Sequence, residues 1–334
     1  MKKNVLLIGG AGYVGTVITD DFLSKGYSVT VLDNFEYGNY NAVISYLGNK
    51  NYRIIKGDLS DKETLEQASA QQDVVIILAG LVGDPITKKY PQASAIINEK
   101  GIKECIDFYD DKDIDNLIFI STCSNYGLIK EDEKADENFE LKPLSLYAKA
   151  KVSIEQYLLK KEKSVKYSAT VLRFATAFGL SPRMRFDLSV SEFVRDVFFG
   201  EELYIFDEHT WRPYCHVRDF AELLDIVIKA NRDKIHFEVF NAGGDINNHT
   251  KKMIVDLIKK YVPSANIKYG TNGSDPRNYR VDFEKVSSVL NFKPSYTVED
   301  GVVELLAALE MGFYKSSLES KESFGNYTLV NYES

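Results

Sequence analysis

The sequence predicts an α/β protein with a doubly wound parallel sheet and a smaller C-terminal α/β domain. Apolar runs with the length of buried strands alternate with helical stretches through the first half of the chain. A glycine cluster follows the first of these runs, in the stretch VLLIGGAGYVG. After Gly179 the alternation ends, and short elements follow a segment that carries a proline and two arginines.

Length and composition restrict the class of protein. The 334 residues are 44% hydrophobic and 27% charged, enough for one large domain or two smaller ones. No apolar run reaches the length of a membrane span, and the short run after Lys2 and Lys3 ends in glycines, unlike a signal peptide. A net charge of −8 argues against nucleic acid as a partner. Cys105, Cys123 and Cys215 show no metal-ligand spacing and fit a reducing cytoplasm, so we expect a cytoplasmic protein without a metal.

The opening stretch predicts a site for a diphosphate. A strand is expected over Lys3–Ile8 and a helix over Tyr13–Lys25, with the glycines between them. One glycine permits the tight turn, a second lets backbone N–H groups approach the phosphates, and a third lets the helix pack close to the sheet. Two overlapping patterns fit: Gly10, Gly12 and Gly15, or Gly9, Gly12 and Gly15.

The second expected strand, Ser28–Leu32, ends in an acid. The carboxylate of Asp33 can accept hydrogen bonds from both ribose hydroxyls of NAD and would repel the 2′-phosphate of NADP. The next residues are Asn34 and Phe35 rather than an arginine, so the sequence favours NAD. The alternative is that Asp33 only opens a turn.

Further strands are expected over Tyr52–Lys56, Asp73–Leu78, Asn116–Ser121 and Ser168–Phe174. Small or polar residues follow each of them, in GDLSD, AGLVGDP, STCSNYG and RFATAFG. In a parallel sheet these ends meet at one edge, where ligands bind. Asp58 is expected to bond the adenine amine while Leu59 packs on the ring; alternatively they are a turn acid and a core leucine.

The end of the strand–helix alternation after Gly179 predicts two domains. Residues 1–179, with about 213–246, are expected to bind the dinucleotide, and 180–212 with 247–334 to bind the substrate. The polar tail after Lys315 receives no assignment.

The stretch LSLYAKAKVSIEQYL carries the expected chemistry. Tyr147 and Lys151 lie four residues apart on a predicted helix and share a face, whereas Lys149 points elsewhere. A free tyrosine has a pKa of about 10, and lowering it by about 3 units takes about 4 kcal/mol, which a nearby ammonium and a nicotinamide cation could supply. Tyr147 would then remove a proton from a sugar hydroxyl while hydride leaves for NAD. Thr122 is expected to bridge the substrate hydroxyl and the phenol, with Ser124 as a second contact.

The chain resembles the extended short-chain dehydrogenase/reductase family, specifically its NAD-dependent nucleotide-sugar epimerase/dehydratase branch. The resemblance is carried by the order and spacing of the three glycines, Asp33, GDL, ST…YG and YAKAK. The resemblance covers nearly the whole chain and implies a Rossmann-type sheet, a nucleotide-diphosphate sugar as substrate, and catalysis by Tyr147, Lys151 and Thr122. It also implies a homodimer formed by the helix of Tyr147 and one near Asn98–Tyr109.

The later arginines take their expected roles from the same resemblance. WRPYCHVRD places Arg212, and DPRNYRVD places Arg277, where the family contacts the nucleotide diphosphate. AGLVGDP with GLSPRMRFDL resembles a subgroup of bacterial enzymes of surface-polysaccharide pathways, in which Arg183 and Arg185 would hold the sugar or its phosphate. The alternative is that these two arginines are solvated and open a helix.

The expected site follows from these motifs and the resemblance. The predicted cofactor-binding residues are Gly9, Gly12, Tyr13, Val14, Gly15, Asp33, Asn34, Asp58, Leu59, Ala79, Gly80, Leu81, Asn98, Tyr147 and Lys151. The predicted substrate-binding residues are Thr122, Ser124, Arg183, Arg185, Arg212 and Arg277.

One departure from the family pattern bears on the reaction. Sugar 4,6-dehydratases of the family carry an Asp–Glu pair after the catalytic threonine, and here Cys123 and Ser124 occupy those positions. A neutral cysteine cannot replace the aspartate, which disfavours a dehydratase. Cys123 is expected to be a small buried residue, with acid/base chemistry as the alternative. His216 and the other histidines are expected to be structural.

Three functions stay open from the sequence. The first is a nucleotide-sugar epimerase that acts through a transient 4-keto intermediate. The second is a net C4 dehydrogenase or reductase of a nucleotide-linked sugar or heptose. The third is a non-catalytic dinucleotide-sensing protein, which the presence of both Tyr147 and Lys151 disfavours.

Overall fold

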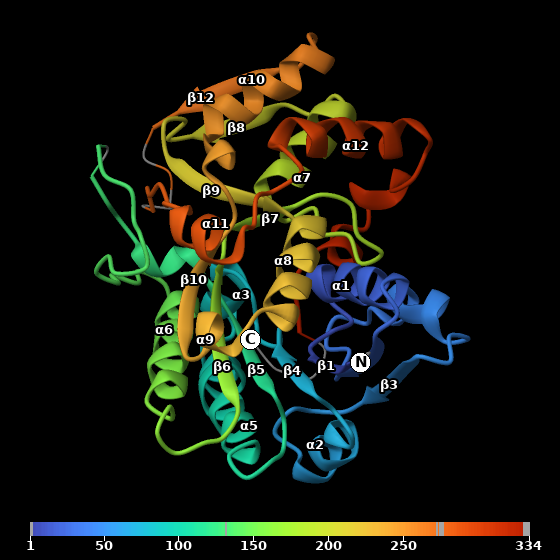
Figure 1. The fold of residues 1–334 in the computed structure, drawn as a ribbon. Coiled ribbons are helices and arrows are strands. Elements are labelled where there is room, and N and C mark those ends of the chain that lie inside the picture. Colours follow the sequence, from blue (N-terminus) through green and yellow to red (C-terminus); the bar gives the residue numbers. More distant parts are fainter. Residues whose placement is uncertain (1–2, 131, 272, 274–276, 330–334) are drawn as a thin grey trace.

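The computed structural model describes residues 3–130, 132–271, 273 and 277–329, and a seven-stranded parallel sheet forms its centre (Figure 1). Every pair of neighbouring strands in this sheet is parallel. In spatial order the strands are β10 (Glu238–Ala242), β6 (Ser168–Phe174), β5 (Asn116–Thr122), β4 (Val74–Ile77), β1 (Asn4–Ile8), β2 (Ser28–Asp33) and β3 (Tyr52–Lys56). The predicted doubly wound sheet is confirmed, and each predicted strand forms within one residue of its expected bounds.

Helices cover both faces of the large sheet. Apolar residues of α1 (Tyr13–Ser24), α8 (Val217–Lys229), α9 (Arg232–Ile235) and α11 (Glu284–Leu290) join one buried core. Residues of α2 (Lys62–Ser69), α5 (Ile102–Phe108) and α6 (Leu146–Leu159) join the core on the opposite face. The buried strands alternate their side chains between these two cores, which is why they read as continuous apolar runs.

A smaller part lies above the large sheet in Figure 1. Its strands form two small sheets, one with the order β11 (Asn248–Thr250), β9 (Trp211–His216) and β7 (Thr176–Phe178), the other from β12 (Ile267–Gly270) and β8 (Leu203–Phe206). Its helices are α7 (Ser189–Phe198), α10 (Lys251–Tyr261) and α12 (Val298–Glu310). These elements share a third core, to which Tyr13 and Val17 of α1 contribute.

Short helices complete the described chain. They are η1 (Tyr40–Tyr46), α3 (Asp84–Lys89), α4 (Pro91–Ala95), the π-helix η2 (Ile96–Gly101), η3 (Cys123–Tyr126), η4 (Asp245–Asn247), η5 (Lys315–Ser317) and η6 (Lys321–Phe324). The helix expected near residues 98–109 is therefore η2 followed directly by α5.

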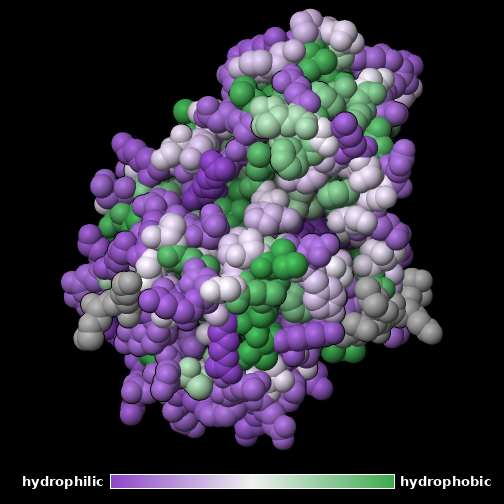
Figure 2. Space-filling model, turned by 90° about the vertical axis from the view of Figure 1, so that its right-hand side faces the viewer, coloured by the Kyte–Doolittle hydropathy of each residue, from purple (hydrophilic) through white to green (hydrophobic). Residues whose placement is uncertain are grey.

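Figure 2 shows the side of the molecule that carries α1 and α12: hydrophilic residues cover most of it, and apolar residues gather in separate areas of the upper and lower parts. The exposed apolar side chains of the chain include Ile44 and Leu47 near η1, and Met311 and Phe313 after α12. Within the described ranges no helix is both long and apolar enough to cross a membrane.

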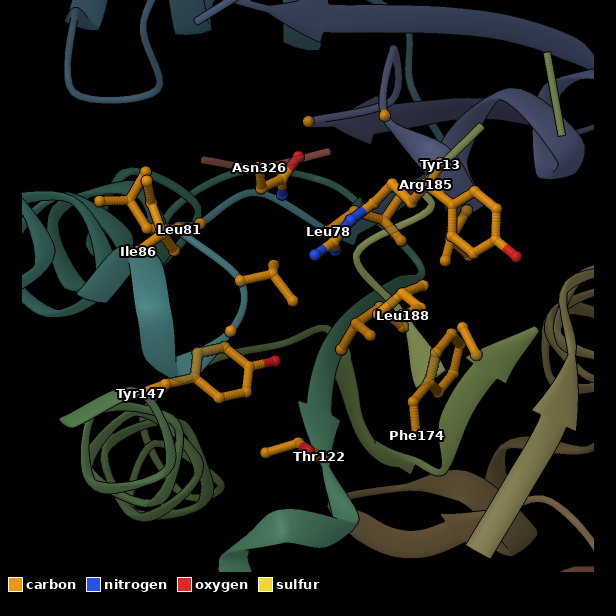
Figure 3. Close-up of a pocket in the computed structure, with 18 of the residues that line it drawn as sticks. Tyr13, Leu78, Leu81, Ile86, Thr122, Tyr147, Phe174, Arg185, Leu188 and Asn326 are labelled. Carbon is orange, nitrogen blue, oxygen red and sulfur yellow. The ribbon is translucent and has the colours of Figure 1, made fainter. Parts of the chain in front are cut away.

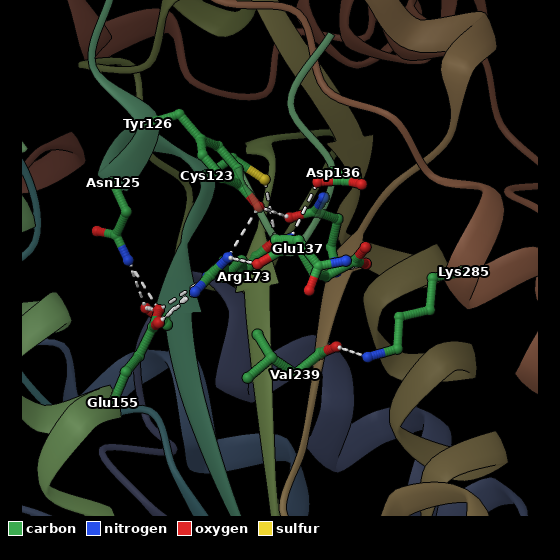
Figure 4. A network of polar contacts seen from close by, with 12 residues as sticks. Cys123, Asn125, Tyr126, Asp136, Glu137, Glu155, Arg173, Val239 and Lys285 are labelled. Carbon is green, nitrogen blue, oxygen red and sulfur yellow. Dashed lines mark hydrogen bonds and ion pairs between the residues drawn. The ribbon is translucent and has the colours of Figure 1, made fainter. Parts of the chain in front are cut away.

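A buried ion pair ties α6 to the strands beside it (Figure 4). Arg173 of β6 donates from Nη2 to Glu155 Oε2 of α6 at 2.8 Å. The same carboxylate accepts hydrogen bonds from Ser121 Oγ and from Asn125 Nδ2, the latter at 2.7 Å. Arg173 also donates from Nη1 to the hydroxyl of Tyr126 at 2.9 Å. Because every partner of the carboxylate belongs to β5, η3 or β6, the network holds α6 at one position along the sheet.

Replacing Glu155 by glutamine should destabilise the protein by about 3–5 kcal/mol, because a buried guanidinium loses its counter-charge. Urea unfolding followed by circular dichroism measures the change. The matched control is Glu66→Gln, whose side chain is 62% exposed in its pair with Lys112 and should cost less than about 1 kcal/mol. Equal losses for the two variants would contradict the role assigned to the pair.

Candidate active site

One cavity of about 650 Å³ lies between the carboxyl ends of the large sheet's strands and the smaller part (Figure 3). Residues of both parts line it. Every residue predicted to bind cofactor or substrate belongs to this lining, with the exception of Asn98. Side chains that are more than 100 positions apart in the sequence thus meet at a single site.

The glycine loop shows why side chains are excluded between β1 and α1. Gly9 has a φ of +80°, and a Cβ there would lie 2.6 Å from Ala79 Cα. A Cβ on Gly15 would lie 2.5 Å from the carbonyl oxygen of Gly10, so Gly15 permits the close packing of α1. A Cβ on Gly12 would meet no described atom closer than 3.8 Å, and Gly12 lines the cavity. A Cβ on Gly10 would lie 2.8 Å from Leu7 Cβ, so this glycine too is required by packing, but only Gly9, Gly12 and Gly15 line the cavity.

The beginning of α1 faces the cavity and suits an anion. Gly12 is the N-cap residue and supplies no side-chain cap for the first N–H groups of the helix. Tyr13, Val14 and Gly15, the first helical residues, all line the cavity. Uncapped N–H groups and the helix dipole together favour the negative charge of a diphosphate.

Asp33 lines the cavity and also orders the turn after β2. Its Oδ2 accepts a hydrogen bond from the Ala11 amide and its Oδ1 one from the Phe35 amide, both at 2.9 Å. Burial raises the pKa of Asp33, while these hydrogen bonds and Arg183 act in the opposite direction. The two interpretations of this acid, turn residue and ligand contact, are therefore compatible.

Asp58 and Leu59 are compatible with both interpretations considered for them. Asp58 accepts hydrogen bonds from Asn34 Nδ2 at 3.2 Å and from the Ser60 amide at 2.9 Å. Leu59 belongs to the core beneath the sheet, yet it lines the cavity together with Asp58.

Asn98 lies outside the cavity lining, contrary to the expected cofactor contact. Its fully buried side chain accepts a hydrogen bond from the Leu81 amide at 2.7 Å and donates to the Leu81 carbonyl at 2.9 Å. Asn98 thus supports the backbone of the loop after β4, and Gly80 and Leu81 of that loop reach the cavity instead.

Tyr147 and Thr122 point into the cavity from α6 and the end of β5 (Figure 3). The Thr122 hydroxyl lies 2.9 Å from Ser124 Oγ, and both residues line the cavity together with Tyr147. Lys151 shares the helix face of Tyr147, with its Nζ 5.9 Å from the phenol ring centroid. Its ammonium also donates to the Ile120 carbonyl at 2.8 Å. The structure therefore brings the phenol, the ammonium and the two hydroxyls together in one cavity.

Burial governs the pKa values of Tyr147 and Lys151. It raises the pKa of Tyr147 above its usual range, and Arg185 is the main charge that lowers it. Burial also lowers the pKa of Lys151 to about 7, with Glu155 acting in the opposite direction. The expected lowering of the phenol pKa was assigned to Lys151 together with a nicotinamide cation, so it stays a prediction for the protein with NAD bound. Lys149, the other cation of the motif, is exposed, as expected.

Arg183 and Arg185 are buried residues of the cavity wall, so they are not solvated residues that open a helix. Helix α7 begins only at Ser189. Arg185 Nε donates to Asp187 Oδ1 at 2.9 Å. The guanidinium of Arg183 lies 5.4 Å from the Tyr37 ring centroid, and its Nη1 has no hydrogen-bond partner among the described residues.

Arg212 and Arg277 form the second basic group of the cavity. Arg212 Nη1 donates to the Arg277 carbonyl, and its guanidinium lies 5.0 Å from the Tyr279 ring centroid. Arg277 Nη2 lies 3.2 Å from Asp84 Oδ2. Both arginines line the cavity, as do Asp84 and Tyr279.

Cys123 takes no part in the cavity lining. Its thiol is buried and donates to the Arg173 carbonyl at 3.0 Å, and burial raises the thiol pKa. It is therefore a buried packing residue. His216 accepts a hydrogen bond from the Arg218 amide at the start of α8 and lies 2.7 Å from Glu304, a structural arrangement.

Several cavity residues were not foreseen from the sequence. Asp84 lies within AGLVGDP, and Asp187 lies two residues after Arg185, so their proximity to named motifs was a usable signal. Arg173 begins the RFATAFG stretch, which was expected to lie at the ligand-binding edge of the sheet. Its side chain instead turns away from the cavity toward Glu155. Phe174, Leu188 and Tyr279 also lie within named stretches, whereas the lining residues without a local sequence signal include Tyr37, Glu192, Asn326 and Tyr327.

Known proteins resemble this chain over most of its length. The low-salt glycan biosynthesis protein Agl12 of Haloferax volcanii is 28% identical over 307 residues, which cover 90% of this chain and 96% of that protein. A UDP-glucose 4-epimerase of Corynebacterium glutamicum is 26% identical over 317 residues, covering 90% and 93%. The solved UDP-glucose 4-epimerase of Thermotoga maritima with UDP-glucose superimposes with a TM-score of 0.81 at 25% identity, covering 92% of this chain and 99% of that one.

The family model described as the NAD dependent epimerase/dehydratase family matches residues 5–243. This match spans the glycine loop, Asp33, Thr122 and the pair of Tyr147 and Lys151. The chain therefore belongs to the NAD-dependent epimerase/dehydratase family, a branch of the extended short-chain dehydrogenases/reductases, and its cofactor is NAD.

Proposed function

We propose that this chain is a nucleotide-sugar 4-epimerase that acts through a transient 4-keto sugar. One observation carries the proposal: Ser124, Thr122 and Tyr147 line the same cavity as the glycine loop and four arginines. This supports a site that combines a proton acceptor, a cofactor cradle and an anion-binding wall.

The residues present fit NAD. The open space at Gly12 and the uncapped start of α1 suit its diphosphate, and Asp33 suits the hydroxyls of its adenosine ribose. Bound NAD would supply the acceptor, and then the donor, of the hydride at C4 of the sugar, as well as a positive charge near the phenol.

The proton steps are assigned to Tyr147. Its phenol removes the proton of the sugar C4 hydroxyl and returns it after the keto sugar has turned over. Thr122 orients the phenol and the sugar hydroxyl, and Ser124, whose Oγ lies 2.9 Å from the Thr122 hydroxyl, extends the proton path. Because burial disfavours the phenolate, the positive charges of Arg185 and of bound NAD are needed to stabilise it.

The arginines are assigned to the nucleotide diphosphate and the sugar. Arg212 and Arg277 suit the diphosphate, and Arg183 and Arg185 suit phosphate or sugar oxygens on the opposite wall. UDP-glucose, which the Thermotoga maritima relative binds, is therefore the first substrate to test. The name of the Haloferax volcanii relative supports a role in glycan biosynthesis.

The residue after Thr122 argues against a 4,6-dehydratase. Cys123 faces the Arg173 carbonyl rather than the cavity, and burial keeps its thiol neutral. The structure therefore offers no acid/base group at the position where dehydratases are expected to need an aspartate.

Product analysis tests the proposed reaction. The protein should convert UDP-glucose, or another nucleotide sugar from a panel of UDP, dTDP, GDP and CDP sugars, to a product of unchanged mass. Proton NMR should show an altered coupling at C4. A product lacking two hydrogens would show net dehydrogenation, and a loss of water would show dehydration; either result would overturn the epimerase. A rise in melting temperature selects the sugars worth testing.

Replacing Tyr147 by phenylalanine should lower kcat by about 10²–10⁴-fold, because the proton acceptor is lost while the ring stays. The matched control is Tyr157→Phe on the same helix, whose hydroxyl binds Asp107 on the protein surface. That variant should turn over at the wild-type rate. Undiminished turnover by the Tyr147→Phe variant would remove the proposed mechanism.

We also propose a homodimer formed by α6 together with η2 and α5. These helices pack side by side, and Ile96 and Leu146 expose apolar side chains on them. Ile96→Asp should halve the mass measured by light scattering, because a charge would be buried at the interface. Leu128→Asp, at an exposed residue outside these helices, should leave the mass unchanged. A monomeric wild type would contradict the dimer.

A further inference from the structure

The C-terminal segment Gly325–Leu329 crosses the cavity, although no motif in the tail predicts it. After α12 the chain forms η5 and η6 and then continues as an extended segment. Asn326 and Tyr327 of this segment line the cavity. Figure 3 shows the Asn326 side chain directed into it, between Leu81 and Arg185.

One end of the segment is held by the smaller part. The Phe186 amide donates to the Phe324 carbonyl at 2.7 Å. Arg183 Nη2 donates to the Gly325 carbonyl at 3.0 Å, and the Asn326 amide donates to Asp187 Oδ2 at 3.3 Å. The segment is therefore attached to the same loop that supplies Arg183 and Arg185.

The other end is held by the elements after β4. Leu329 is only 7% exposed and packs in a small apolar cluster with Leu81, Ile86, Tyr90 and Ala93. Lys89 Nζ donates to the Tyr327 carbonyl at 3.2 Å, which adds a polar contact on the same side. The segment thus bridges the two walls of the cavity.

The bridge lies beside the part of the cavity assigned to NAD. Arg183, which holds Gly325, is close enough to Asp33 to lower the pKa of that carboxyl group. Leu81 belongs to the loop after β4, whose Ala79 lies next to Gly9. Gly80 and Leu81, at the other end of the bridge, belong to the same cavity lining as the start of α1. A dinucleotide lying along this edge of the sheet would pass beneath the segment.

We propose that Gly325–Leu329 is a strap that closes the cavity over a bound dinucleotide, and that Asn326 contacts a diphosphate-bearing ligand. The inference rests on the proposed function, because an epimerase restores its cofactor in each turnover and has no need to release it. The strap would also keep the 4-keto sugar in place until hydride returns. Its Asn326 amide can donate to the diphosphate of NAD or to that of the nucleotide sugar.

The test measures release of NADH by its fluorescence, with no sugar present. Leu329→Asp should accelerate NADH release by about 10-fold or more, because the buried anchor would leave its apolar cluster. The matched control is Met311→Asp, whose side chain is 73% exposed and lies before the strap. It should release NADH at the wild-type rate. A truncation after Phe324 repeats the test without a new charge, and it should also release NADH faster.

Unchanged NADH release in both the Leu329→Asp variant and the truncation would overturn the strap. Asn326→Ala is tested separately for binding of NADH and of UDP-glucose. Weaker binding of either compound supports the contact and identifies which diphosphate Asn326 meets, whereas unchanged binding of both overturns it. Failure of the wild type to epimerise any nucleotide sugar would remove the proposed function and leave the NADH measurement intact.

Discussion

The geometry of the site depends on the buried pair of Arg173 and Glu155. The carboxylate of Glu155 lies one helical turn after Lys151 and two turns after Tyr147 on α6. Its partners Ser121 and Asn125 flank the Thr122–Ser124 stretch at the end of β5. A helix held in this way keeps its phenol in the cavity that Thr122 also lines. A charge pair in this position has a large desolvation cost, which its full set of hydrogen bonds offsets.

The cavity carries charges of both signs in a protein of net charge −8. Its basic residues are the four arginines, Lys151 and Lys251, and its acidic residues are Asp33, Asp58, Asp84, Asp187 and Glu192. Two of the arginines are oriented by acids, Arg185 by Asp187 and Arg277 by Asp84. Side chains that are ordered before a ligand arrives lose less entropy on binding, and burial strengthens their attraction for phosphates. Overall charge therefore says little about the ligand, whereas the ordered arginines suit an anion.

Burial also sets the chemistry of the reacting groups. It raises the pKa of Tyr147 and lowers that of Lys151 to about 7, so desolvation shifts both groups toward their neutral forms. Positive charge delivered with a ligand would therefore change the protonation of the phenol at the moment when a proton acceptor is needed. An enclosed site in which a ligand changes the protonation of the phenol suits a reaction whose intermediate has to stay bound. The segment Gly325–Leu329, which crosses the cavity, is consistent with such an enclosed site.

The sequence by itself determined the large sheet, the glycine loop, Asp33 and the shared helix face of Tyr147 and Lys151. These features depend on short-range physics: the period of buried residues along a strand or helix, the conformational freedom of glycine, and the four-residue spacing on a helix. Only the tertiary structure decided that Arg173 turns away from the cavity, that Asn98 supports a loop, and that burial raises the pKa of the phenol. It also decided that Gly325–Leu329 bridges the two walls of the cavity. These outcomes depend on which distant residues meet and on how much water they exclude, and no local pattern encodes either quantity.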